Sequence, residues 1–146
     1  MTADAQPWNC VVNLEDTTAR SDLKGHPGVT AHRFVSGPDN GTRWLLLTLN
    51  KIEPGGGIDP HYHEDLTADH AYFLIDGDVV ARIGDEEHVV RPQGLMVFQS
   101  DIVHGFRVVG DQPATVLRLG AAPDGVATGR SVFVDDDAPP EVSDSR

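Results

Sequence analysis

Short apolar segments alternate with turn sequences along most of the chain. The segment RWLLLTLNKI at 43–52 is almost continuously apolar, which is typical of a strand with neighbours on both sides. The Asn-Gly pair within 37–42 predicts a hairpin turn. Further strands are predicted at 30–36, 71–77, 78–84, 87–91, 95–99, 104–109 and 114–120. Seven or more short strands at close spacing predict an all-β sandwich or barrel.

Composition supports one β-rich domain. The 146 residues include 15 glycines and 10 prolines, so turns are frequent and long helical patterns are missing. A chain of this length can bury a core large enough to fold unaided. We divide it into an N-terminal segment at 1–29 that packs on or pairs with the barrel, a barrel at 30–134, and an acidic, solvated and mobile tail at 135–146.

Charge and cysteine content narrow the partners and the compartment. The formal net charge of −12 repels phosphate backbones and anionic lipid headgroups, which argues against nucleic-acid and membrane-surface partners and leaves a small molecule. The single cysteine, Cys10, allows no intramolecular disulfide. The N-terminus has no signal-peptide pattern, and no apolar run reaches 18 residues. These observations favour a cytoplasmic protein.

Three of the seven histidines fall within residues 61–70. His61 and His63 are two residues apart, so on a strand they point to the same face. His70 shares the parity of Tyr72 and Leu74 on the next predicted strand. His104 likewise shares the parity of apolar neighbours in HGFRVV. Four histidines from about three strands are therefore expected to face one interior.

Clustered histidines in a small barrel favour a metal site. A single inward histidine is more often a core residue with satisfied hydrogen bonds than a metal ligand. For the pair His61 and His63 alone, the two interpretations would be equally favoured. Four uncompensated imidazoles are costly to bury unless a metal or an extensive hydrogen-bond network satisfies them. Neutral imidazole suits zinc, copper, iron and nickel. The other three histidines, His26, His32 and His88, are expected to have surface or structural roles.

The spacing of these residues resembles the two motifs of the cupin family. Gly55 is followed by five residues and then by His61 and His63. His70 is followed by six residues and then by Gly77, as the glutamate of the first cupin motif is. The second motif resembles GLMVFQSDIVHGF, with His104 as its histidine. The likeness covers roughly residues 43–120.

The sequence departs from the family pattern at the acidic ligand. His70 occupies the position of the usual glutamate, and the gap from His63 is longer than in the family. Glu64, Asp65 and Asp69 lie in that gap, so an acidic ligand from the loop stays open, although strand parity favours His70. In the second motif Ser100 replaces a proline and Val108 replaces an asparagine.

The resemblance implies a cupin-type jelly-roll barrel and a homodimer. It also implies one divalent transition metal per chain, held by His61, His63, His70 and His104. Zinc or iron is expected ahead of manganese or nickel. Four protein ligands on an octahedral ion leave two open positions. A neutral ligand set keeps the ion a strong Lewis acid, suited to cyclisation, isomerisation or lyase chemistry on a small enolisable oxygenated metabolite, as in cupin-type polyketide cyclases.

Two other functions stay open from the sequence. An Fe(II)-dependent dioxygenase of a diketone or aromatic substrate would use the same two open positions, and a non-catalytic module would only bind a ligand or metal. Tyr72, Gln99 and Asp101 are the candidates for proton transfer. Phe73, Phe98, Phe106 and Trp44 are assigned to packing.

Overall fold

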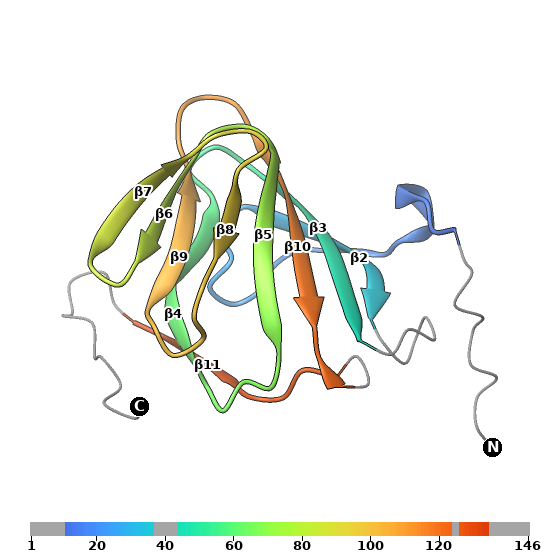
Figure 1. Ribbon diagram of the computed structural model, residues 1–146. Helices are drawn as coiled ribbons and strands as arrows, with labels where there is room; N and C mark the ends of the chain where they lie inside the picture. Colours follow the sequence, from blue (N-terminus) through green and yellow to red (C-terminus); the bar gives the residue numbers. More distant parts are fainter. Residues whose placement is uncertain (1–10, 37–43, 124–125, 135–146) are drawn as a thin grey trace, which may run out of the picture.

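The computed structural model describes residues 11–36, 44–123 and 126–134 (Figure 1). The hairpin predicted within 37–42 and the tail at 135–146 lie outside the described residues. A 3-10 turn, η1 (Leu14–Asp16), precedes the strands. The strands are β1 (Ala19–Arg20), β2 (Val29–Ser36), β3 (Leu45–Ile52), β4 (Gly57–Glu64), β5 (Asp69–Asp76), β6 (Val79–Ile83), β7 (Glu86–Val90), β8 (Leu95–Val97), β9 (His104–Val108), β10 (Ala114–Ala121) and β11 (Arg130–Phe133).

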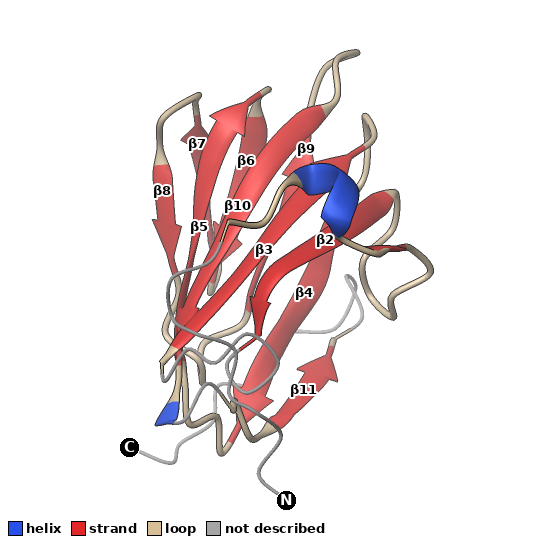
Figure 2. Cartoon of the chain, turned by 90° about the vertical axis from the view of Figure 1, so that its right-hand side faces the viewer, coloured by secondary structure: helices blue, strands red, loops and turns tan. Residues whose placement is uncertain are grey.

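The strands form two antiparallel sheets, which confirms the all-β prediction. One sheet has the order β1-β2-β3-β10-β5-β8 and the other β11-β4-β9-β6-β7. Strands that are distant in sequence, such as β3 and β10, are neighbours in space (Figures 1 and 2). The nearly continuous apolar strand β3 lies between β2 and β10, as its composition predicted. This is a jelly-roll barrel, and no helix in its described part is long and apolar enough to cross a membrane.

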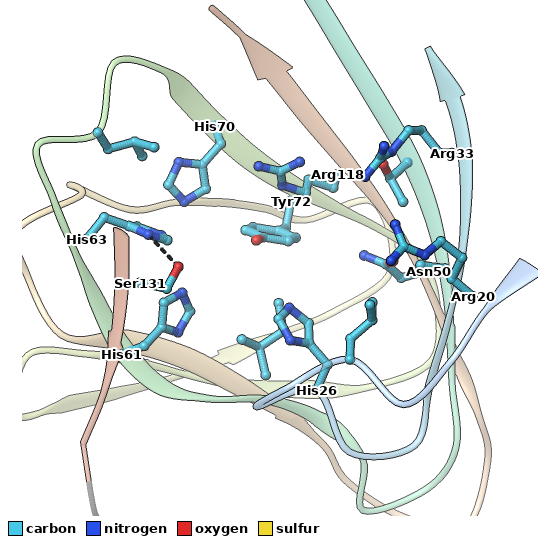
Figure 3. A pocket seen from close by; sticks show the side chains of 15 residues that line it. Arg20, His26, Arg33, Asn50, His61, His63, His70, Tyr72, Arg118 and Ser131 are labelled. Carbon is cyan, nitrogen blue, oxygen red and sulfur yellow. Dashed lines mark hydrogen bonds between the residues drawn. The ribbon is translucent and has the colours of Figure 1, made fainter. Parts of the chain in front are cut away.

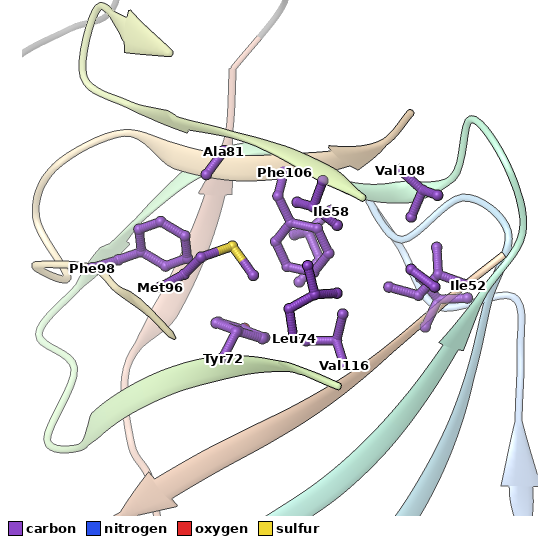
Figure 4. Packing of buried hydrophobic residues seen from close by; sticks show 13 residues of the cluster. Ile52, Ile58, Tyr72, Leu74, Ala81, Met96, Phe98, Phe106, Val108 and Val116 are labelled. Carbon is purple, nitrogen blue, oxygen red and sulfur yellow. The ribbon is translucent and has the colours of Figure 1, made fainter. Parts of the chain in front are cut away.

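The apolar core fills the space between the two sheets (Figure 4). Leu74, Val79 and Val116 are completely buried there. Strand β5 illustrates the reason, because from Asp69 to Ile75 its burial alternates and every second side chain points inward. Of the aromatic residues assigned to packing, Phe98 and Phe106 are buried with 5% and 3% of their surface exposed.

Two aromatic residues do not lie where the sequence predicted. Phe73 is only half-buried, because it has the opposite parity to Tyr72 and lies on the outer face of β5. Trp44 precedes β3 and keeps 51% of its surface exposed, so its assignment to packing was wrong. A long apolar run does not reveal which of its ends is covered by other elements.

The ends of the described chain complete the two sheets. Strand β1 pairs with β2 through Ala19 opposite His32 and Arg20 opposite Ala31. The loop after β1 also holds the start of β4, since the Asp59 amide donates to the Gly25 carbonyl at 2.8 Å. Strand β11 pairs with β4 along its whole length. Neither β1 nor β11 was predicted, because each is short and lacks an alternating apolar pattern.

Candidate metal centre

Three strands bring four histidines together between the sheets. His61 and His63 share one face of β4, His70 lies near the start of β5, and His104 begins β9. His61 is the direct register partner of His104. His61, His70 and His104 are buried, and His63 is half-buried. The predicted inward parity of all four residues agrees with this arrangement.

Close approach of β9 to β4 fixes this register. Gly105 follows His104, and a Cβ atom at Gly105 would lie 2.6 Å from the Ile58 carbonyl oxygen. A side chain there would push the two strands apart. Glycine therefore allows the backbones to lie close enough for His61 and His104 to share one site.

His61, His63 and His104 form a compact triad. One ring nitrogen from each lies within 4.8 Å of the others, which is a spacing that one metal ion can bridge. The ring of His70 lies next to the triad, with its centroid 5.2 Å from that of His63 and 5.6 Å from that of His104. The described structure therefore brings three of the predicted ligands together and places the fourth beside them.

Backbone carbonyls orient two of the triad rings. Nδ1 of His61 contacts the Asp59 carbonyl oxygen at 2.8 Å, and Nδ1 of His104 contacts the Ile102 carbonyl oxygen at 2.7 Å. A carbonyl can only accept, so each Nδ1 carries the proton and donates it. The tautomer leaves Nε2 of both rings with a free lone pair, the usual arrangement of metal-binding histidines.

Strand β11 orients the third ring. Ser131 is the register partner of His63, and its hydroxyl lies 3.0 Å from Nδ1 of His63. Phe133, two residues on, lies with its ring centroid 5.1 Å from that of His61. The β11 strand thus anchors one ring by a hydrogen bond and covers another with an aromatic side chain.

Several ring nitrogens in this cluster have no protein partner. Nε2 of His104 and both ring nitrogens of His70 are buried, and none of them has a hydrogen-bond partner among the described residues. Each buried unsatisfied polar atom costs about 1–3 kcal/mol. A metal ion accepts the lone pairs that these imidazoles cannot use otherwise. The residues present therefore fit a metal.

Burial keeps the histidines neutral. It lowers the pKa of His63 and His70 to about 4 and that of His104 to about 3, and it also lowers the pKa of His61. Neighbouring cationic groups lower these pKa values further, with Arg118 second to burial for His70. The imidazoles are thus unprotonated at neutral pH, the form that binds metal.

The acidic residues in the loop between His63 and His70 do not reach the cluster. Glu64 pairs with Arg130, a residue of β11. Asp65 and Asp69 are exposed. No carboxylate joins the triad among the described residues. The carboxylate ligand left open by the sequence thus has no support in this structure.

A cavity of about 230 Å³ opens beside the histidines (Figure 3). Tyr72 lines it, but neither Gln99 nor Asp101 does. Gln99 is exposed and Asp101 is half-buried, because both belong to the loop between β8 and β9, outside the inward-facing strand positions. Of the three predicted proton-transfer residues, only Tyr72 lies at the cavity.

Burial also defines the chemistry of Tyr72. Only 5% of its surface is exposed, and this burial raises the pKa of its hydroxyl. The positive charge of Arg118 and the hydrogen bond that Arg118 donates to the hydroxyl offset part of this rise in the pKa. The hydroxyl is therefore protonated at neutral pH. It is suited to donate a hydrogen bond or a proton into the cavity, and unsuited to act as a base.

The other three histidines have the roles expected of them, with one addition. His32 contacts the Thr17 hydroxyl through Nδ1 at 2.9 Å, and His88 lies 3.3 Å from Glu86 on the surface. His26 donates from Nδ1 to the Lys24 carbonyl, but it also lines the cavity. None of the three joins the triad.

Sequence reasoning missed five polar residues that line this cavity. Arg20, Arg33, Arg118 and Asn50 line it together with Ser131. Arg118 had a usable signal, since it interrupts the apolar strand ATVLRLG at an inward parity. The other four residues lie in segments whose apolar pattern does not show which side chains point inward.

A comparison with protein families decides the identity of the barrel. The cupin domain family matches residues 48–120, which is half of the chain. The chain belongs to the cupin family. The match spans β4, β5 and β9, the strands that carry the four histidines.

Solved cupin structures share the fold. The polyketide cyclase RemF from Streptomyces resistomycificus is 22% identical, with a TM-score of 0.68, and the match covers 88% of this chain and 89% of that one. A cupin sugar phosphate isomerase from Silicibacter pomeroyi is 25% identical, with a TM-score of 0.69 and coverage of 88% and 83%. A predicted oxalate decarboxylase from Thermotoga maritima is 19% identical, with a TM-score of 0.67 and coverage of 77% and 99%. No curated protein matches the chain.

The lowered pKa values predict how the metal-free cupin responds to acid. The ordinary pKa of histidine is 6.5, whereas that of folded His70 is about 4. Between these values the unfolded chain binds more protons than the folded one. The free energy of unfolding is therefore highest above pH 6.5 and falls as the pH is lowered towards 4.

Denaturant unfolding of chelator-treated protein at several pH values measures this dependence. His70→Gln should reduce the slope, and the same change at the exposed His88 should leave it nearly intact. An equal slope in wild type and His70→Gln would contradict the assignment.

Proposed function

We propose that this cupin is a metal-dependent enzyme acting on a small, enolisable, oxygenated metabolite by Lewis-acid chemistry. The reaction class is cyclisation, isomerisation or lyase cleavage. One observation carries the proposal. The histidine cluster leaves three buried ring nitrogens without partners among the described residues, and its members His61, His63 and His70 line a cavity that is large enough for a small molecule.

We assign the ligands as His61, His63, His104 and His70. The first three supply the triad, with Nε2 as the coordinating atom. His70 is supported by its two unsatisfied nitrogens and by its place beside the triad. The bound ion is one divalent transition metal per chain, zinc or iron before manganese or nickel.

The chemistry follows from the neutral ligand set. A divalent ion held by four imidazoles keeps its full charge and would polarise a carbonyl oxygen, which acidifies the adjacent C–H bond. Tyr72 is protonated and close to His70, with ring centroids 5.8 Å apart. In this proposal its hydroxyl donates a hydrogen bond to a substrate oxygen. The aromatic rings of Phe98 and Phe106 pack behind Tyr72 and exclude water from this side.

The names of two structural neighbours agree with this class of reaction. One is described as a polyketide cyclase and another as a sugar phosphate isomerase. An isomerase causes no net oxidation of its substrate. With identities of 22% and 25%, these neighbours support a reaction class and not a particular substrate.

Metal analysis combined with an oxygen electrode tests the proposed chemistry. The protein is purified without added metal, its metal content is measured, and oxygen uptake is followed with β-diketones and flavonols. We expect about one divalent ion per chain and no oxygen uptake. His104→Ala should lose the ion, and His88→Ala should keep it.

Two outcomes would replace the proposal with the alternatives. Bound iron together with oxygen consumption would identify a dioxygenase. Protein that retains no metal, even after reloading, would indicate a non-catalytic binding module.

We also propose that this cupin forms a homodimer. The outer face of the larger sheet carries two cross-strand rows of apolar residues and no charged side chain within them. The rows are Leu47, Leu119, Ala71 and Val97, and Leu49, Leu117, Phe73 and Leu95. Monomers rarely expose a contiguous apolar patch of this kind. Because the chain carries a charge of −12, an uncharged face is where two copies can meet without repulsion.

Light scattering during size-exclusion chromatography measures the assembly. Wild type should have twice the 15.7 kDa mass of the chain. Val97→Lys, in the patch, should give a monomer because it buries a charge at the interface. Val89 is 70% exposed and lies on β7 of the other sheet, so Val89→Lys should remain dimeric. A monomeric wild type would contradict the proposal.

A further inference from the structure

Three arginines line the same cavity as the histidines. Figure 3 shows His61 and His63 at one side of the cavity, and Arg20 and Arg33 at the opposite side. Tyr72 and Arg118 lie between the two groups. The cavity thus has a metal-binding side and a guanidinium side.

Strand pairing explains how the arginines meet. Arg33 and Arg118 are both register partners of Thr48, on either side of β3. Arg118 is in turn the partner of Tyr72. These four residues form one row across the inner face of the larger sheet. Strands in a sheet are about 4.8 Å apart, so Arg33 and Arg118 are separated by roughly 10 Å at the backbone. Strand β1 adds Arg20 next to this row.

Among the described residues, no negative charge at the cavity balances these groups. The ion pairs among the described residues use Arg107, Arg130 and His88, none of which lines the cavity. In the part of the chain that the structure describes, no aspartate or glutamate lines it either. The protein as a whole carries a charge of −12, so this positive cavity runs against its overall composition.

A metal ion would increase the imbalance. The four proposed ligands are neutral imidazoles, so a divalent ion would add two uncompensated positive charges to those of the arginines. A site with low-dielectric walls and charge of one sign attracts ligands of the opposite sign. Arginine binds planar carboxylates and phosphates through paired hydrogen bonds.

We propose that the substrate is an anion, bound by its carboxylate or phosphate group at Arg20, Arg33 and Arg118, with its enolisable carbonyl group at the histidines. This inference rests on the proposed function and adds the substrate class to it. The cavity volume of about 230 Å³ is below the roughly 300–1,000 Å³ of drug-sized pockets, so the substrate is small.

Calorimetric titration with matched pairs of probes tests the charge. Acetopyruvate is compared with its methyl ester, which keeps the β-diketone and lacks the carboxylate charge. Dihydroxyacetone phosphate is compared with dihydroxyacetone. Each titration is done on chelator-treated and on metal-reloaded protein. We expect at least one anion to bind more tightly than its neutral partner by about tenfold or more, the size of one charge-assisted hydrogen bond. The pair that shows the preference distinguishes a carboxylate from a phosphate.

Arginine variants locate the preference. Arg33→Gln and Arg20→Gln should each reduce the affinity for the anion several-fold and leave that for the neutral partner unchanged. Arg91→Gln makes the same change in net charge at an exposed residue outside the cavity, and should keep the preference. The inference is wrong if neither anion binds more tightly than its neutral partner, or if Arg91→Gln loses the preference as fully as Arg33→Gln does.

The two proposals can fail separately. If reloaded protein retains no metal but still prefers the anion through Arg33, the metal function fails and the anion site stands. If the metal binds and the anion preference is absent, the anion site fails alone.

Discussion

The site depends on burying several imidazole rings side by side in the interior of a β-barrel. The histidines lie where a barrel of this size would otherwise place apolar side chains, and Phe98 stacks on His104 with ring centroids 4.6 Å apart. Removal from water strips the rings of hydrogen bonds and favours their neutral form. Carbonyl oxygens and a serine hydroxyl restore one bond each for His61, His104 and His63. The nitrogens left over are those that can bind a metal.

The rest of the barrel holds this arrangement. Register between β4 and β9 places His61 opposite His104, and the glycine at 105 lets the two strands approach. Strand β11 closes the same edge, with Ser131 and Phe133 facing His63 and His61. The larger sheet supplies His70 and Tyr72 from β5, and then the arginine row from β2 and β10. The two sheets thus contribute different side chains to one site, histidines mainly from one sheet and arginines from the other.

Strand parity was enough to predict the histidine faces. His61 and His63 share a face because they are two residues apart, and His70 and His104 could be placed by their apolar neighbours. Parity could not predict contacts that depend on which strands are neighbours. Arg33 and Arg118 are 85 positions apart and meet only because both strands flank β3. Ser131 reaches His63 through a strand of four residues with no recognisable pattern. Gln99 and Asp101 were predicted from their distance to His104 in sequence. The backbone of their loop contacts the histidines, but neither side chain lines the cavity.

The central claim is that four histidines and no carboxylate hold one metal ion. Diffraction from metal-loaded crystals, recorded at the absorption edge of the bound metal, tests it most directly. One anomalous peak is predicted per chain, about 2.0–2.2 Å from Nε2 of His61, His63 and His104 and from a ring nitrogen of His70. A peak coordinated by a carboxylate oxygen in place of His70, or no peak at the triad, would contradict the account.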